Sequence, residues 1–460
     1  MADTTDIHYT YALCRWAGEL NPAAVTDGLF EQVRLRALDW LGCTIGAMGA
    51  PPVNAMIHIA HWLGGEKQCT LIGQREPVSL LNAIFVNASA GHVLEYDDVN
   101  KPSISHPGAA VIPTALAVGE VVKASFEQYA AAVIVGYEVV VRLGTVLNPS
   151  LYDFWHTTSA CGIFAAAITA GKLLGLDAET LERAAALAGM MASGLVYGFG
   201  TDAKLVNVGH AAAAGTLAAL LAREGLTAPE AVLESSKGYG AAVSNSRDFS
   251  GLLPKPGEPY GIEESYFKLH SSCGHTHTSI DACHALMTQR PFSWQDVEEI
   301  HVYAYRKAVE LVGEFRHDTP ARAKFSLPYC LAAKILYGNV TLNVFEENVL
   351  RDDRIAELAS RITVSEDPSY TVRYPEIRQE QVEITLKNGD RLIGSCELPE
   401  GKTPDISVIQ KKFYELSTRA IMPESADAVC KELLSASRQT EISALMKTLR
   451  EVVYCGKQHD

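Results

Sequence analysis

The stretch YAAAVIVGYEVVVRLG, residues 129–144, is apolar on almost every side when it is drawn as a helix. Such a helix has no broad polar face to turn toward water, so it must lie inside a layer of other helices. The neighbouring runs between Val111 and Gly225 have the same character, and their many alanines and glycines allow helices to approach closely. The sequence therefore predicts a large all-helical core.

The pattern of apolar and polar residues changes beyond the segment 251–261, which is rich in proline and glycine. Apolar and polar residues then alternate with a period of two, as in β-strands, and an Asn-Gly dipeptide predicts a hairpin turn at 388–390. The predicted elements are, in chain order, helix 278–289, strand 298–305, helix 326–337, and strands 381–385 and 391–396. Helices alternating with strands indicate a second domain of the α+β type.

The predicted fold is therefore mainly α, in three consecutive parts. Residues 1–265 form the first part of the all-helical domain and open with two amphipathic helices. Residues 266–399 form the smaller α+β domain. Residues 400–460 return to amphipathic helix, which we expect to pack back on the first part and complete it.

Composition and charge favour a soluble enzyme. The 54 acidic and 39 basic residues give a net charge of −15, which disfavours nucleic acid and anionic membranes as partners but leaves a small anionic substrate possible. Charges at Arg142, Lys172 and Lys204 interrupt the longest apolar runs, so we expect no membrane span. The N-terminus carries acids where a signal peptide carries bases, which favours a cytoplasmic location. The ten scattered cysteines form no CxxC pair, so they predict neither a zinc knuckle nor disulfides.

A charged loop, EYDDVNKPSISHPGAAVIP at residues 95–113, lies between two apolar runs with helical character. Its prolines interrupt the helices, and a polar loop held between rigid helices is a favourable place for a site. His106 in this loop can act as acid or base near neutral pH. Asp97 and Asp98 resemble the start of a magnesium motif, but no further acid follows at the required spacing. The alternative is that one of the aspartates caps a helix or accepts hydrogen bonds from the loop backbone.

Two further segments carry candidate residues. Lys204 follows a glycine-containing loop and precedes an alanine-rich helix, where a lysine can hold a carboxylate. Lys268 is a candidate for anion binding, and Cys273 is either a thiol in the site or a small buried residue. His275 and His277 form an HxH pair, which is a weak zinc signal, so hydrogen bonding or helix capping is the favoured interpretation.

Six segments together resemble the MmgE/PrpD family, whose members include 2-methylcitrate dehydratase, cis-aconitate decarboxylase and iminodisuccinate epimerase. The segments are HVLEYDDVNKPSISHPGAAVIPTALAVGE, GYEVVVRLG, WHTTSACGIFAAAITAGKLLGLD, FGTDAKLVNVGHAAAAG, FKLHSSCGHTHTSIDA and KFSLPYCLAAKILYG. The resemblance implies a large helical domain with a smaller inserted α+β lid, and a homodimer. It also implies a reaction without metal or other cofactor, in a basic cleft between the domains.

The resemblance also implies roles for individual residues. His106 would transfer a proton at carbon, Asp97 would orient it, and Tyr329 would be the partner acid. Lys204 and Lys268 would bind substrate carboxylates and stabilise the negative charge that develops beside them. The remaining residues expected at the substrate are Glu95, His156, Cys273 and His277.

Four positions depart from the family pattern. Decarboxylases of the family have an aspartate at Glu95, a threonine at Val99 and a histidine at Cys273, while Asn207 stands where a histidine is common. The loop before His106 also appears one residue longer. Cys273 is the residue found in dehydratase-like and epimerase-like relatives, which favours those activities over decarboxylation.

We therefore expect a cofactor-independent lyase, a dehydratase of the 2-methylcitrate type, acting on a small di- or tricarboxylate. An epimerase of the iminodisuccinate type and a decarboxylase of the cis-aconitate type are the alternatives within the family. A non-catalytic binding or scaffold protein is the alternative from another class, and the changes at Val99, Asn207 and Cys273 are its support.

Overall fold

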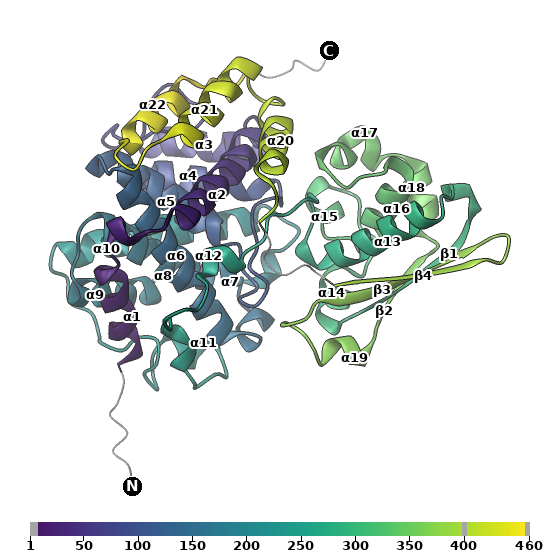
Figure 1. The fold of residues 1–460 in the computed structure, drawn as a ribbon, viewed down its shortest axis with the longest axis horizontal. Helices are drawn as coiled ribbons and strands as arrows, with labels where there is room; N and C mark the ends of the chain where they lie inside the picture. Colours follow the sequence, from purple (N-terminus) through teal and green to yellow (C-terminus); the bar gives the residue numbers. More distant parts are fainter. Residues whose placement is uncertain (1–7, 398–402, 456–460) are drawn as a thin grey trace, which may run out of the picture.

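The computed structural model describes residues 8–397 and 403–455 and divides into two lobes (Figure 1). The larger lobe is helical throughout, and the smaller lobe combines helices with one four-stranded sheet. The chain runs through the larger lobe, crosses into the smaller one and returns, so the smaller lobe is inserted. This confirms the predicted mainly α fold with a smaller α+β domain.

The centre of the larger lobe consists of helices that are apolar on nearly all sides. They are α4 (Leu80–Val93), α5 (Pro107–Val122), α6 (Phe126–Leu147), α8 (Gly162–Leu173) and α10 (Ala203–Arg223). Helix α10 packs against both α4 and α8, and α8 also packs against α5 and α6. Most residues of these helices are buried, which is the environment that their composition requires.

Two of these helices, α6 and α10, are long and apolar enough to cross a membrane by length and composition alone. The expectation that charges interrupt every such run was wrong, because Arg142 and Lys204 lie near helix ends rather than in the middle. Both helices are mostly buried by other parts of the protein. They are therefore explained as core helices.

The two ends of the chain meet in the larger lobe. Helix α20 (Ile406–Ser417) packs along α2 (Asp27–Gly46), and α22 (Ile442–Glu451) packs against α5. Helix α21 (Pro423–Ser435) lies between them in Figure 1 and contacts both α20 and α22. The tail helices thus share the main hydrophobic cluster with the N-terminal helices. The other helices of this lobe are α1 (Tyr9–Glu19), α3 (Pro51–Leu63), α7 (Thr157–Ala160), α9 (Ala178–Met190), α11 (Tyr239–Val243) and α12 (Gly261–Glu264).

The sheet of the smaller lobe has the strand order β2-β1-β3-β4. The strands are β1 (Val297–Ala304), β2 (Ile362–Glu366), β3 (Gln379–Leu386) and β4 (Arg391–Glu397). Only β1 and β2 pair in parallel, and β3 and β4 are joined by the predicted Asn-Gly hairpin. Strand β2 was not predicted from the sequence.

One side of the sheet is covered by α13 (His277–Gln289), on which α16 (Leu327–Tyr337) packs in turn (Figure 1). These elements share a second hydrophobic cluster, whose buried members come from the smaller lobe and against which Phe199 of the larger lobe packs. The remaining helices are α14 (Arg306–Val312), α15 (Pro320–Ala323), α17 (Glu347–Leu350), α18 (Asp353–Ala359) and α19 (Pro368–Thr371). The predicted boundary at 265 and 266 stays a prediction, and the one at 399 and 400 lies outside the described residues.

Close contact between α8 and α10 gives a testable prediction. A Cβ atom added to Gly215 of α10 would lie 2.3 Å from the backbone oxygen of Ile163 in α8, which cannot move without shifting the helix. We expect Gly215→Ala to lower the free energy of unfolding by about 1–3 kcal/mol. The midpoint of thermal unfolding, followed by circular dichroism, measures the effect.

Gly28 provides the matched control, since it is exposed in α2 and a Cβ atom there would meet only Thr26, at 4.0 Å. Gly28→Ala should raise stability by about 0.5–1 kcal/mol, because alanine loses less backbone entropy in a helix. Equal melting temperatures for Gly215→Ala and the wild type would contradict the close packing of α8 and α10.

Candidate active site

The charged loop begins directly after α4 and turns back on it. Glu95 has a φ angle of 53°, in the left-handed region that residues other than glycine seldom adopt. This turn brings Asp97 back to His92, which lies in the last turn of α4. Non-glycine residues in this conformation occur at sites where the surroundings hold them, and functional sites are among these.

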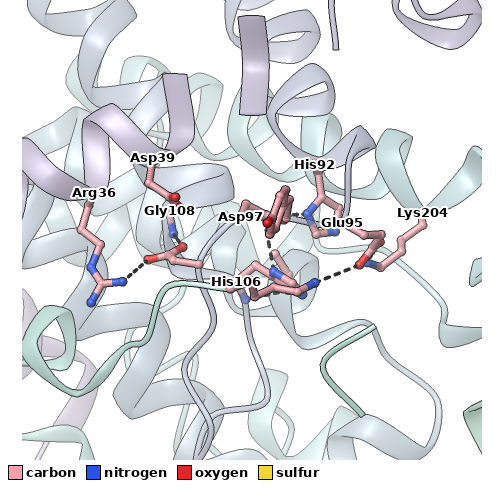
Figure 2. Close-up of polar contacts among 12 residues, drawn as sticks. Arg36, Asp39, His92, Glu95, Asp97, His106, Gly108 and Lys204 are labelled. Atoms are coloured by element: carbon pink, nitrogen blue, oxygen red, sulfur yellow. Dashed lines mark hydrogen bonds and ion pairs between the residues drawn. The ribbon is translucent and has the colours of Figure 1, made fainter. Parts of the chain in front are cut away.

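Asp97 lies between two imidazole rings. Its Oδ2 atom is 2.8 Å from Nδ1 of His92 and 3.3 Å from Nδ1 of His106 (Figure 2). Burial opposes ionisation of Asp97, but the two histidines outweigh it and hold the pKa of the carboxyl well below its usual value. Asp97 is therefore a carboxylate, which only accepts hydrogen bonds.

The carboxylate of Asp97 determines the state of His106. The proton of the imidazole belongs on Nδ1, next to Asp97, which leaves Nε2 of His106 with a free lone pair. Burial lowers the pKa of His106 below 6.5, and Asp97 opposes this shift. At neutral pH His106 is thus an uncharged imidazole that can accept a proton.

Asp98 points away from this group and has a different role. Its Oδ1 accepts a hydrogen bond of 3.0 Å from the backbone N–H of Gly108 at the start of α5, and its Oδ2 accepts one of 2.7 Å from Tyr137. The guanidinium of Arg36 lies 3.7 Å away (Figure 2). The two aspartates do not converge, so the magnesium interpretation has no support, whereas the structural role proposed for one of them fits Asp98.

His92, Asp97 and His106 place three potential ligand atoms within 4.8 Å of one another, which is also compatible in composition with a metal site. Their Nδ1 atoms, however, face Asp97 Oδ2 at hydrogen-bond and ion-pair distances. Metal ligands must instead direct their lone pairs to one common point. We therefore interpret the three residues as an acid–base group.

Glu95 forms the second charged group of the site. Its carboxylate is hydrogen bonded to Nζ of Lys204 from the start of α10 (Figure 2). It also lies 3.7 Å from Nζ of Lys268. Burial opposes ionisation of Glu95, but the lysines and nearby histidines bring its pKa far below the usual value. Lys324 lies near the same carboxylate, and burial lowers its pKa to about 8. Three lysines around one carboxylate leave an excess of positive charge.

These groups face a small cavity of about 30 Å³ between the two lobes. The larger lobe contributes Glu95, His106, Tyr152, His156 and Lys204 to its polar lining, and the smaller lobe contributes Cys273, His275 and Arg378. A second, larger cavity shares Glu95, Lys204 and Phe325 with it and extends between the lobes. The predicted site residues therefore surround a small space where the two lobes meet, and the larger cavity adjoins it at Glu95 and Lys204.

Five of the sequence-predicted residues lie at this cavity together: Glu95, His106, Lys204, His156 and Cys273. Asp97 lies directly behind His106. Burial lowers the pKa of the His156 imidazole well below 6.5 and raises the pKa of the Cys273 thiol, so both are uncharged at neutral pH.

Besides Asp97, three predicted residues do not line the cavity, namely Lys268, His277 and Tyr329. Lys268 is completely buried behind Glu95, so it acts on the site through that carboxylate rather than at the surface of the cavity. His277 bonds through Nε2 to the carbonyl of Ser272, 3.2 Å away, while His275 bonds through Nδ1 to the Tyr305 hydroxyl at 2.6 Å. The HxH pair therefore has separate hydrogen-bond partners, as the interpretation without zinc expects.

Tyr329 requires a correction. Its side chain is buried in the hydrophobic cluster of the smaller lobe, and its hydroxyl donates a hydrogen bond of 2.5 Å to the carbonyl of Val344. The expectation that Tyr329 is the partner acid was wrong, because the N-terminal turn of α16 directs this side chain into the lobe rather than toward His106.

Sequence reasoning missed His92, Tyr152, His275 and Arg378. His92 could have been found from its place five residues before Asp97 at the end of an apolar helix. Glu380 and Val382 are buried, and Arg378 precedes them at the same spacing of two residues. The period of the strand therefore places Arg378 on the same inward face. Tyr152 has no comparable local signal, and the HxH pattern at His275 did not indicate this cavity, because both residues reach it only through the packing of the two lobes.

Residues 11–252 match the model of the MmgE/PrpD N-terminal domain, and residues 270–436 match that of the C-terminal domain.

Cis-aconitate decarboxylase of Aspergillus terreus is 25% identical over 96% of this chain and 95% of the relative. The human cis-aconitate decarboxylase is 27% identical over 93% of this chain and 91% of the relative. The 2-methylcitrate dehydratase of Escherichia coli is 26% identical, over 48% of this chain and 47% of the relative. Because the two domain models together cover most of its length, the chain belongs to the MmgE/PrpD family.

Proposed function

We propose that this protein is a hydro-lyase that removes water from a small di- or tricarboxylate without a cofactor. The observation that carries the proposal is the uncharged imidazole of His106, held by Asp97 at the wall of a cavity with excess positive charge. A base beside cations is the arrangement needed to take a proton from a carbon next to a carboxylate. Relatives with lyase names, both decarboxylases and dehydratases, support the class of reaction.

The first half of the reaction is proton removal. Lys204 binds the substrate carboxylate next to the reacting carbon, while Glu95 holds the lysine in place. His106 takes the proton from that carbon through Nε2, and the electron pair of the broken C–H bond moves onto the carboxylate as an enediolate. Lys204 stabilises the charge that develops there, and Asp97 stabilises the imidazolium that forms.

The second half is loss of the hydroxyl group. The enediolate electrons form the carbon–carbon double bond, the carbon–oxygen bond breaks, and the leaving oxygen takes a proton to become water. Tyr152 replaces Tyr329 as the donor, because it lines the cavity and burial keeps its pKa well above 10, so its hydroxyl is protonated. The proton on His106 then returns through solvent to the Tyr152 phenolate, which restores both groups.

Decarboxylation of a cis-aconitate-like acid is the second candidate, favoured by the decarboxylase relatives that match nearly the whole chain. It breaks a carbon–carbon bond, releases carbon dioxide and needs a proton donor at carbon. An uncharged His106 with a bare Nε2 is a base rather than a donor, so this reaction takes second place. Epimerisation follows if the hydroxyl is absent and the proton returns to the opposite face. The expected homodimer and cytoplasmic location stay predictions.

The activity is tested by incubating the protein with 2-methylcitrate, citrate, cis-aconitate and iminodisuccinate in deuterated water. Dehydration appears as ultraviolet absorbance of a new double bond, decarboxylation as released carbon dioxide, and epimerisation as deuterium uptake without net conversion. We expect dehydration of a hydroxy acid. No change in any of the four acids would favour the non-catalytic alternative.

The roles of His106 and Lys204 give a second prediction. His106→Ala and Lys204→Ala should each lower kcat/KM at least about a hundredfold, because the base and the charge that stabilises the enediolate are lost. Steady-state kinetics measures this on proteins whose circular dichroism matches the wild type.

Controls of the same residue types are His301→Ala, on β1 of the smaller lobe, and Lys237→Ala, which is exposed; neither residue lines the cavity. Both should keep wild-type rates. Wild-type kcat/KM in His106→Ala would remove this residue from the mechanism.

The pH dependence gives a third prediction. His106 must be uncharged to accept a proton, and burial lowers its pKa below 6.5, so the midpoint of the acidic fall in kcat/KM should lie below pH 6.5. Asp97 raises this pKa, so Asp97→Asn should move the acidic limb to still lower pH while lowering kcat. A pH–rate profile of both proteins measures the limb, and a limb above 6.5 in the wild type would contradict the assignment of His106.

A further inference from the structure

Arg378 is a buried cation on the smaller lobe, directly before β3. Its side chain lies in the wall of the cavity and only 2% of the residue is exposed. A Cβ atom added to Gly274, which also lines the cavity, would lie 3.7 Å from Nη1 of Arg378. The guanidinium thus reaches the cavity from the smaller lobe, whereas Lys204 reaches it from α10 of the larger lobe.

The guanidinium makes few polar contacts with the described part of the chain. Nη2 donates a hydrogen bond of 3.0 Å to the backbone carbonyl of Lys101, and the group lies 5.8 Å from the ring centre of Tyr374. Its Nε atom is buried and has no hydrogen-bond partner among the described residues. The nearest acid along the strand, Glu380, accepts a hydrogen bond from the Ser279 hydroxyl instead.

Three buried cations in and near the site have an acid within ion-pair distance, whereas Lys324 donates to the Leu94 carbonyl and has no such acid among the described residues. Lys204 has Glu95, Arg36 has Asp98, and Lys412 has Asp39. No described carboxylate lies within ion-pair distance of Arg378. A buried guanidinium is costly without an anion, so its place at a cavity indicates that a ligand supplies the missing charge.

We propose that Arg378 binds a second carboxylate of the substrate, so that the site selects acids with two or more carboxylates. The first carboxylate lies at Lys204 on the larger lobe, and the second meets the planar guanidinium on the smaller lobe. The fork of N–H groups matches a carboxylate with two parallel hydrogen bonds. The inference rests on the proposed function, because that function places the first carboxylate at Lys204.

Binding across the cavity also connects specificity to the two lobes. A dicarboxylate contacts both lobes at once, whereas a monocarboxylate satisfies only one of the two cationic groups. The competing interpretation is that Arg378 serves only to join the lobes through the Lys101 carbonyl. In that structural role Arg378 would affect the affinity for every ligand equally. The two interpretations therefore predict different selectivity between dicarboxylates and monocarboxylates.

The test is calorimetric titration of the wild type and its variants with tricarballylate, succinate and butyrate, which needs no turnover. Arg378→Gln should lower the affinity for tricarballylate and for succinate about 10- to 100-fold, which is the size expected for the loss of charge-assisted hydrogen bonds. The affinity for butyrate should change less than about threefold, since butyrate lacks the second carboxylate. Arg378→Lys keeps the charge without the fork, and we expect an intermediate loss.

Arg373→Gln is the matched control, because Arg373 lies five residues earlier in the same segment and is 43% exposed in its side chain. It should bind all three acids as the wild type does. Thermal unfolding without ligand shows whether each variant is folded; if Arg378→Gln is not folded, Arg378→Lys carries the test.

Three results would overturn the proposal: equal weakening of all three acids, unchanged binding of succinate and tricarballylate, or a wild type that binds tricarballylate no more tightly than butyrate. Selective weakening in a protein without turnover would support Arg378 and count against the hydro-lyase. Dehydratase activity in the wild type, together with unchanged affinities in Arg378→Gln, would support the hydro-lyase and count against the role of Arg378.

Discussion

The buried carboxylate of Glu95 is the charge on which the arrangement of the site depends. An ionised acid in a protein interior needs cations, and Glu95 has Lys204 from α10 and Lys268 from the junction between the lobes. Its backbone adopts a left-handed conformation that directs the following residues back toward α4. Glu95 thus pairs with lysines from distant parts of the chain and helps to place Asp97 beside His92.

Backbone carbonyls of the same loop also hold the smaller lobe. The carbonyl of Leu94 accepts hydrogen bonds from Ser271 and Lys324, and that of Lys101 accepts one from Arg378. Val99 pairs with Tyr266 in an antiparallel bridge. The loop that supplies the proposed base is therefore also a contact surface between the lobes, so the relative position of the lobes and the geometry of the base are set by shared contacts.

Much of the site follows from residue type, but less of its geometry does. The polar loop between apolar helices already indicated His106, and the doubt between Asp97 and Asp98 was settled only by their opposite directions. The place of Tyr329 in a family motif did not give the direction of its side chain, because α16 turns its hydroxyl to Val344 inside the smaller lobe. Cys273 lies at the cavity but is an uncharged thiol, so its departure from the family pattern changes the shape and polarity of the site rather than its charge.

The sequence by itself determined the class of the fold, because helices such as α6 and α8 are stable only when they are covered on all sides, and strands of period two need a sheet. These are local patterns, and a single chain displays them directly. Only the tertiary structure decided which charges meet. Glu95 and Lys204 lie far apart in the sequence, and Arg378 comes from a different lobe. Burial and distance, which set ionisation and pairing, arise only when these segments pack together.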